Sequence, residues 1–138
     1  MFLIPNLQTV YDLVGGDSFF KALVDTFYDK IDKDDLLRHM FPVSLEEPKK
    51  WNYLFMRMIF GGPDDYVPQR GHPRMRKRHF PFKIGLNERN RWFNLMMESI
   101  EGLISKDHEA YPIMKKYFDH MATKMINQPI IADQFKES

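Results

Sequence analysis

The densest group of side chains capable of chemistry lies in the stretch QRGHPRMRKRHFPF, residues 69–82. Four closely spaced cations precede a single imidazole, and two phenyl rings follow it: Arg74, Arg76, Lys77, Arg78, His79, Phe80 and Phe82. An imidazole can ligate a metal, cationic side chains can bind an anion, and phenyl rings can pack on an apolar surface. The formal net charge of the chain is only +1, so this positive charge is local.

Three interpretations of this basic stretch are open from the residues alone. The first is a solvated surface, which is what most charge runs form. The second is a contact with nucleic acid, and the third is a small dianionic ligand that is bound locally. A protein that binds a phosphate backbone normally spreads many cations along one face. Here the basic segment is short and the chain is close to neutral, so we expect no nucleic-acid partner.

The other reactive residues form no recognisable catalytic or metal-binding motif. The five histidines include no pair at the spacing of a helical zinc site: His39, His72, His79, His108 and His120. The sequence has no cysteine, which excludes disulfides and thiolate ligands and is compatible with a reducing compartment. The VGGD sequence lacks the lysine of a phosphate-binding loop, and nothing points to a hydrolytic triad.

The elements that must position these residues are helices, because apolar residues recur at helical spacing along nearly the whole chain. The face formed by Phe20, Leu23, Val24, Phe27 and Ile31 is one example. The expected helices cover residues 18–31, 32–41, 44–60, 74–79, 87–103 and 107–127. The sequence shows no strand pattern, repeat or low-complexity tract, so the predicted fold class is all-α.

The expected helix boundaries rest on capping residues and helix breakers. Asp17 is predicted to be an N-cap. The start of the third segment has two incompatible signals, because Ser44 and Glu47 fit a capping box while Pro48 favours the first turn. The connection over residues 61–73 is rich in Gly and Pro, and irregular connections of this length are usually functional or disordered.

Length and composition indicate one domain that spans residues 1–138, with a frayed tail over residues 129–138. Aromatic residues make up 14% of the chain, and it contains 12 Phe and 10 Met, which is more large apolar surface than so small a core needs. This excess suggests that a flat apolar group packs among the rings. No apolar run reaches the roughly 20 residues of a membrane span, and the start lacks a signal peptide, so we expect a cytoplasmic protein without a membrane partner.

Several motifs resemble the truncated haemoglobins, specifically group II. They are YDLVGGDSFFKALVDTFYDKI, MFP, FGGPDDYVPQRGHPRMRKRHFPF and ERNRWFNLM, and the resemblance extends from about Tyr11 to Gln128. It implies a two-over-two helical sandwich, with two antiparallel helix pairs around haem b. In this fold the Gly15-Gly16 pair allows a very short first helix to turn into the second, and Gly61-Gly62 ends the distal helix.

The resemblance implies that His79 is the proximal iron ligand, with its other ring nitrogen bonded to a backbone carbonyl. It also implies a set of residues that contact the haem ring or its propionates: Phe41, Phe55, Tyr66, Met75, Arg76, Arg78 and Phe82. The basic stretch then supplies an iron ligand, cations for the propionates and an apolar wall in one segment. Lys50 and Trp51 stand where the resemblance leads us to expect a basic residue on the opposite rim.

On the distal side, the resemblance places Tyr28 and Trp92 as hydrogen-bond donors to a ligand on the iron. Asn52 is the one polar residue on an otherwise apolar helical face, so it requires a buried partner. Pro48 stands where many globins carry a distal histidine, and proline cannot donate a hydrogen bond.

The resemblance favours a protein that reversibly binds O₂, with O₂, CO, NO or other small haem ligands as partners. One alternative is a haem enzyme, an NO dioxygenase or a peroxidase-like protein, which uses the same pocket and an unidentified reductase. A second, from a different class, is a basic helical module that binds nucleic acid without haem. An absorption spectrum separates the nucleic-acid-binding module from the two haem proteins. The O₂-binding protein and the haem enzyme use the same pocket, so the sequence does not separate them.

Overall fold

The computed structural model describes residues 8–129, so residues 130–138 of the tail expected to fray lie outside the described part. Within residues 8–129 the chain forms helices and no β-strand. The elements are α1 (Val10–Val14), α2 (Asp17–Asp32), the 3₁₀ helix η1 (Arg38–Met40), α3 (Glu46–Ile59), α4 (Val67–Arg70), α5 (Met75–His79), α6 (Leu86–Glu101) and α7 (Ala110–Lys124). No helix in the described range is both long and apolar enough to cross a bilayer.

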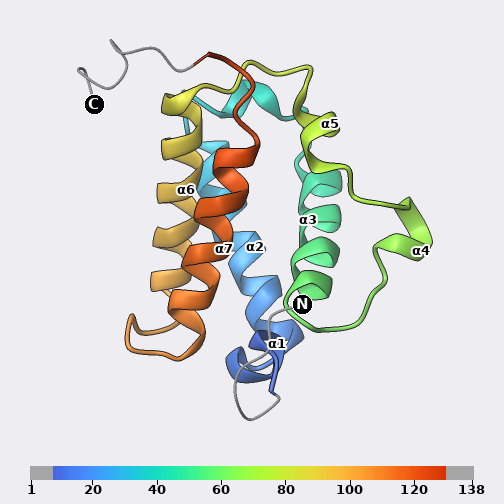
Figure 1. Cartoon of the computed structure of the whole chain (residues 1–138), viewed down its shortest axis with the longest axis vertical. Coiled ribbons are helices and arrows are strands. Elements are labelled where there is room, and N and C mark those ends of the chain that lie inside the picture. Colours follow the sequence, from blue (N-terminus) through green and yellow to red (C-terminus); the bar gives the residue numbers. More distant parts are fainter. Residues whose placement is uncertain (1–7, 130–138) are drawn as a thin grey trace.

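The four long helices form two antiparallel pairs, as Figure 1 shows. Helix α2 packs against α3, and α6 packs against α7. The two pairs are joined where α2 packs on α6. The predicted all-α class and the two-over-two helical sandwich are thus confirmed.

The apolar stripes of these helices form the core because their spacing puts them on one face. In α2 the predicted stripe is buried throughout, and Phe20, Phe27 and Ile31 have no exposed surface. Met96 and Ile100 of α6 and Met114 of α7 are equally buried. Full burial of one such side chain stabilises the folded chain by about 1.5–3 kcal/mol, so the core is supplied chiefly by these helical faces.

The prediction that Asp17 is the N-cap of α2 is wrong. Gly16 occupies that position, and Asp17 is the first residue of the helix. The Asp17 carboxylate instead accepts hydrogen bonds from the Tyr11 hydroxyl at 2.6 Å and from the Arg57 guanidinium at 3.4 Å. Both donors lie outside the first turn of α2, and Arg57 is 40 positions away, so the local sequence around Asp17 does not predict these bonds.

The conflict at the start of α3 is resolved in favour of Pro48. The helix begins at Glu46 with Leu45 as N-cap, so Pro48 lies in the first turn, where its missing N–H has no helical partner to lose. The predicted capping box does not form. Ser44 accepts a hydrogen bond from the backbone N–H of Glu46, and the Glu47 carboxylate accepts one from the Trp51 indole.

Two glycine corners set the positions of the short elements. Gly15 ends α1 in the left-handed conformation, with φ of 99°, and donates its N–H to the carbonyls of Asp12 and Tyr11. After α3, Gly61 has φ of 102°, and a Cβ at Gly62 would lie 2.5 Å from the Tyr11 ring. Both expectations about these glycine pairs are confirmed, since each one ends a helix and redirects the chain.

The connection after α3 is more ordered than its composition suggests. It contains α4, which was not among the helices predicted from the sequence. The Asp64 carboxylate accepts hydrogen bonds from the backbone N–H groups of Tyr66 and Val67, and Pro68 lies in the first turn of the helix. An Asp shortly before a Val-Pro pair is therefore the sequence feature that indicates the start of α4.

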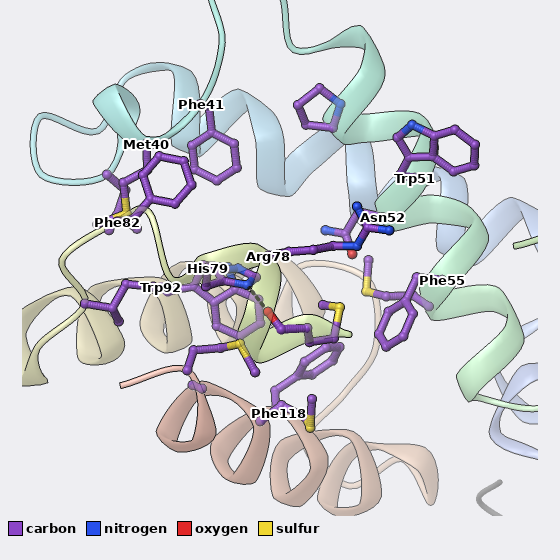
Figure 2. Close-up of a pocket in the computed structure, with 18 of the residues that line it drawn as sticks. Met40, Phe41, Trp51, Asn52, Phe55, Arg78, His79, Phe82, Trp92 and Phe118 are labelled. Atoms are coloured by element: carbon purple, nitrogen blue, oxygen red, sulfur yellow. Dashed lines mark hydrogen bonds between the residues drawn. The ribbon is translucent and has the colours of Figure 1, made fainter. Parts of the chain in front are cut away.

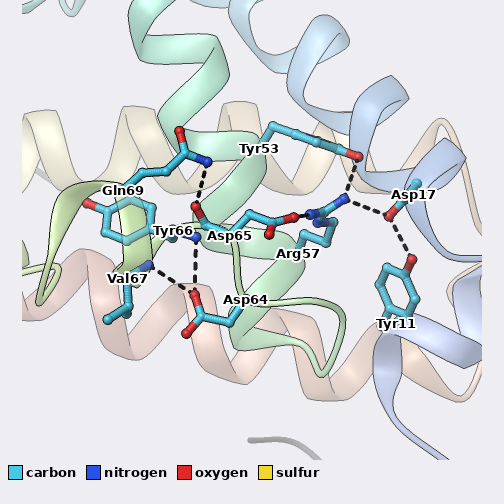
Figure 3. Close-up of polar contacts among 9 residues, drawn as sticks. All are labelled: Tyr11, Asp17, Tyr53, Arg57, Asp64, Asp65, Tyr66, Val67 and Gln69. Atoms are coloured by element: carbon cyan, nitrogen blue, oxygen red, sulfur yellow. Dashed lines mark hydrogen bonds and ion pairs between the residues drawn. The ribbon is translucent and has the colours of Figure 1, made fainter.

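Arg57 fastens this connection to the rest of the fold, as Figure 3 shows. Its side chain projects from α3 and is only 9% exposed. The guanidinium forms ion pairs with Asp17 at the start of α2 and with Asp65 in the connection, and it lies near the Tyr53 hydroxyl. Tyr66, the residue after Asp65, is thereby anchored in the core with 2% of its surface exposed.

Candidate functional site

A cavity of about 500 Å³ lies between the two helix pairs, within the size range of sites for small molecules and cofactors. Side chains from α2, the segment after it, α3, α5, α6 and α7 line it. Figure 2 shows Phe41, Phe55, His79 and Trp92 around the same space, although they come from different elements. Apolar side chains form most of the wall: Leu37, Met40, Phe41, Pro42, Pro48, Phe55, Met56, Met75, Phe82, Ile84, Phe118, Met121, Ala122 and Met125.

His79 is half-buried at the C-terminal end of α5 and lines the cavity. Its Nδ1 lies 2.6 Å from the backbone carbonyl oxygen of Met75. A carbonyl oxygen can only accept, so Nδ1 carries a proton, and in the neutral imidazole Nε2 then keeps the free lone pair. The expected bond from one ring nitrogen to a backbone carbonyl is therefore confirmed, and the remaining nitrogen is available to a metal.

The two sides of α5 differ in what they face. Met75, Arg78 and His79 line the cavity, because residues three and four apart share one side of a helix. Arg76, which we expected at the propionates, does not line the cavity and is exposed, as is Lys77. The position of Arg76 one residue after Met75 turns its side chain toward solvent.

Two arginines lie at the mouth of the cavity. Arg78 was expected there, and its Nε donates to the carbonyl of Pro73 at 2.8 Å, which fixes the base of the guanidinium. Arg70 was not expected. Its guanidinium lies over the Trp51 ring, 4.8 Å from the centroid, and 6.0 Å from the centroid of Tyr66. Arg70 reaches the cavity because it lies in the helical turn, α4, that follows Tyr66.

Arg70 lies at the part of the cavity rim where the sequence suggested only Lys50 and Trp51 as candidate contact residues. The Trp51 indole N–H donates to Glu47 at 2.9 Å, which holds the ring against the rim. Lys50 lies over the same ring, 4.7 Å from its centroid. The Trp51 ring therefore packs against these two cations at the cavity mouth.

Tyr28 of α2 and Asn52 of α3 form a polar part of the cavity wall. The Asn52 side-chain amide donates to the Tyr28 hydroxyl oxygen at 3.3 Å, which confirms that Asn52 has a buried partner. Tyr28 is only 5% exposed, and burial raises the pKa of its hydroxyl to about 12, although the bond from Asn52 acts in the opposite direction. The hydroxyl is thus protonated at neutral pH, and its own proton is not used by Asn52.

Trp92 supplies a second donor. Its ring packs edge-on against Phe27 at 5.6 Å and lies 5.8 Å from Phe118, so its position in the wall is fixed. Trp92 is partly buried and lines the cavity. An indole can only donate, so Trp92 can bind a ligand that carries negative charge.

The other expected contact residues all line the cavity. Phe41 stands edge-on to Tyr28 at 5.8 Å, and Phe55 packs against Tyr66 at 5.7 Å. Phe82 also lines the wall. No residue of α7 was among the predicted site residues, although Phe118, Met121 and Ala122 of this helix and its C-cap Met125 line the wall. The C-terminal end of α7 therefore faces the cavity.

The side chain of Asp34 stabilises the turn that precedes η1. The Asp34 carboxylate accepts hydrogen bonds from the N–H groups of Leu36 and Leu37 and pairs with Arg91 of α6. Burial raises the pKa of Asp34, but the bonds from Arg91 and Leu37 outweigh it, so the pKa lies below its usual value. Leu37, which lines the cavity, is held in place by this turn.

These features match the chemistry of haem b. The ring needs an apolar slot, the iron needs an imidazole nitrogen with a free lone pair, and the propionates need cations at an open edge. The cavity provides the slot, His79 Nε2 provides the nitrogen, and Arg70 and Arg78 provide the cations. No cluster of three or more His, Asp or Glu residues suited to a bare metal ion occurs in the described part of the chain.

The sequence is similar to known globins. A family profile described as bacterial-like globin matches residues 9–127. The group 2 truncated hemoglobin YjbI of Bacillus subtilis is 29% identical over 119 residues, which cover 86% of this chain and 89% of that protein. The match therefore spans nearly the full length of both proteins.

Solved structures agree with this relationship. The hemoglobin of the thermophilic phototrophic bacterium Chloroflexus aurantiacus is 41% identical, with a TM-score of 0.82 over 88% of this chain and 99% of that one. A truncated oxygen-avid haemoglobin from Bacillus subtilis is 28% identical, with a TM-score of 0.81 over 87% of this chain and 100% of that one.

Proposed function

The chain belongs to the bacterial-like globin family as a truncated haemoglobin of group II, and we propose that it binds O₂ reversibly at haem b, with His79 as the protein ligand of the iron. Haem bound in this cavity would supply an iron that can bind a diatomic gas and leave partial negative charge on it. All further steps of the proposal concern the residues of this chain.

His79 holds the haem from one side, and the cations hold its edge. The bond from Nδ1 to the Met75 carbonyl keeps the imidazole in one tautomer and one orientation, with Nε2 as the ligand. Arg78 and Arg70 bind the propionates through charge-assisted hydrogen bonds. Tyr66 stands beside Arg70 and contributes to the same edge.

Tyr28 and Trp92 bind the gas from the other side by donating hydrogen bonds to it. The observation that carries this proposal is the bond from Asn52 to the Tyr28 hydroxyl oxygen. Because Asn52 occupies an acceptor site of the hydroxyl, the Tyr28 proton is left for a second partner. Trp92 also lines the cavity, and its indole N–H can only donate.

Two points favour O₂ over CO as the ligand. Both distal groups are hydrogen-bond donors at neutral pH, and bound O₂ gains more negative charge from ferrous iron than bound CO does. A related protein is named an oxygen-avid haemoglobin, which is the behaviour that two donors produce. Pro48 lines the cavity and has no N–H, so it cannot supply the hydrogen bond that a distal histidine gives in many globins.

The experiment is to record absorption spectra of the oxidised, reduced, O₂-exposed and CO-exposed protein, followed by stopped-flow measurement of O₂ release. A Soret band that responds to both gases, together with slow O₂ release relative to a variant that lacks the donors, supports the proposal. A purified chain without a Soret band after haem addition contradicts it.

A further inference from the structure

The side chain of Asn127 hydrogen-bonds to the segment that carries His79 at three points, although it does not line the cavity. It lies just beyond the C-terminal end of α7, two residues after the C-cap Met125. Its Nδ2 donates to the carbonyl of Phe82 at 2.7 Å and to the carbonyl of His79 at 3.2 Å. Its Oδ1 accepts from the N–H of Ile84 at 2.9 Å.

These contacts use the amide completely. Both hydrogens of Nδ2 face carbonyl oxygens, and Oδ1 faces an N–H group. Only this orientation of the amide matches donor to acceptor at all three contacts. The backbone N–H of Asn127 also donates to the carbonyl of Ile84 at 2.9 Å. The asparagine is therefore joined to both ends of the segment from His79 to Ile84.

Helix α5 needs such support because its own sequence stabilises it poorly. It has five residues, begins after Arg74 in the left-handed conformation with φ of 48°, and has no side-chain N-cap. At its other end Phe80 has helical dihedral angles although it precedes Pro81, a combination that proline disfavours. The turn is closed by a bond from the Phe82 N–H to the same His79 carbonyl that Asn127 contacts.

We propose that Asn127 is a positioning residue for the iron ligand: by fixing the turn from His79 to Phe82 it sets the orientation of the His79 imidazole and links the end of α7 to the haem. The inference rests on the proposed function. Two restraints act on His79 in this arrangement, the bond from Nδ1 to Met75 within α5 and the bond from Asn127 to its carbonyl. The first fixes the tautomer, and the second fixes the backbone from which the ring projects.

The test is the isosteric substitution Asn127→Asp in the haem-loaded ferrous protein. The carboxylate keeps an acceptor for Ile84 but places negative charge against the carbonyls of His79 and Phe82. The iron–histidine stretching band, measured by resonance Raman spectroscopy, should fall in frequency and broaden. The rate of haem transfer to an apo-globin acceptor should rise by about 5- to 30-fold. Asn127→Ala removes the same bonds without adding charge and should change both quantities in the same direction.

The matched control is Asn94→Asp, which adds the same charge at an exposed site of α6 that does not line the cavity. It should leave the Raman band and the haem transfer rate unchanged. Thermal unfolding distinguishes positioning from general stability: a lower melting temperature with an unchanged iron–histidine band overturns the inference. An unchanged band and transfer rate in both Asn127 variants also overturns it. Failure of the parent chain to bind haem refutes the proposed function itself, and the inference falls with it.

Discussion

The side-chain amide nitrogen of Asn52 lies 3.3 Å from the hydroxyl oxygen of Tyr28, and the two residues belong to different helices, α3 and α2. This bond fixes how the Tyr28 hydroxyl can be used. An amide nitrogen can only donate, so the hydroxyl must be the acceptor, and its hydrogen points away from Asn52. Asn52 therefore orients the donor without competing for the ligand.

The first prediction concerns that orienting role. Asn52→Leu should raise the O₂ dissociation rate by about 2- to 10-fold, because the hydroxyl remains but loses a neutral hydrogen bond of about 0.5–1.5 kcal/mol. The rate is measured by stopped-flow mixing with a scavenger. CO dissociation, which depends less on donors, is the internal control. An increase as large as that of a variant lacking the hydroxyl would show that Asn52 contacts the ligand itself.

The second prediction is that His79→Ala loses haem or holds it with an altered spectrum, because its Nε2 is the only imidazole nitrogen that the structure brings to the cavity within residues 8–129. The measurement is the Soret band after haem addition and gel filtration. His39→Ala and His120→Ala are the controls and should keep the parental spectrum, since neither residue lines the cavity. Full retention of a native band by the His79 variant would refute the assignment.

Helical periodicity predicted most of the fold, whereas the candidate site residues came from the resemblance of local motifs to group II truncated haemoglobins. The buried stripe of α2 follows the spacing of its apolar residues, and the glycine pairs mark the ends of α1 and α3. The polar residue on the apolar face of α3 was also a local signal, and its need for a partner was met by Tyr28.

What the sequence did not predict depends on residues that meet only after folding. Arg57 reaches Asp17 across 40 positions, and Asn127 reaches His79 across 48. Each is an ordinary polar residue in its own segment, so no spacing rule identifies it. Arg76 lies outside the cavity lining for a related reason, because a one-residue difference in position on a five-residue helix decides which way a side chain faces.

The third prediction concerns the cations at the cavity mouth. Arg70→Gln and Arg78→Gln should each speed haem transfer to an apo-globin acceptor by about 10-fold, because each removes a charge-assisted hydrogen bond that is partly screened by solvent. Arg76→Gln is the matched control and should have no effect, since Arg76 does not line the cavity. Equal transfer rates in all three variants would mean that the propionates are held by other groups.

The fourth prediction concerns stability and pH. Asp34→Asn should lower the free energy of unfolding at pH 7 by about 1–2 kcal/mol, because the charge that pairs with Arg91 is lost. The pKa of Asp34 lies below its ordinary value of 3.8, so the stabilisation is present above that pH and is lost as the pH falls through the folded-state pKa. Urea unfolding at pH 7 and at pH 3 measures it.

The expected result is a difference between variant and parent that is largest at pH 7 and shrinks at pH 3. Asp35→Asn is the control, since Asp35 is almost fully exposed and lies 3.6 Å from Arg91. It should change stability by less than about 0.5 kcal/mol. A difference for Asp34→Asn that does not depend on pH would indicate lost packing in place of a lost charge.

The last prediction addresses the distal donors. Tyr28→Phe and Trp92→Phe remove a polar group and keep an aromatic ring, so the packing against Phe41 and Phe118 is largely preserved. A hydrogen bond to a charged acceptor contributes about 1.5–3 kcal/mol, so each variant should release O₂ about 10- to 150-fold faster if association is little changed. CO release should change much less in both.

The double variant separates a shared ligand from two independent effects. If Tyr28 and Trp92 donate to the same ligand, removing one changes what the other contributes, and the two effects on O₂ release should not be additive. The pKa of about 12 implies that the Tyr28 hydroxyl stays protonated from pH 6 to pH 10, so its contribution should be constant over that range. If both single variants release O₂ within about twofold of the parent, the effect is well below one such bond, and the cavity admits the gas without binding it through these donors.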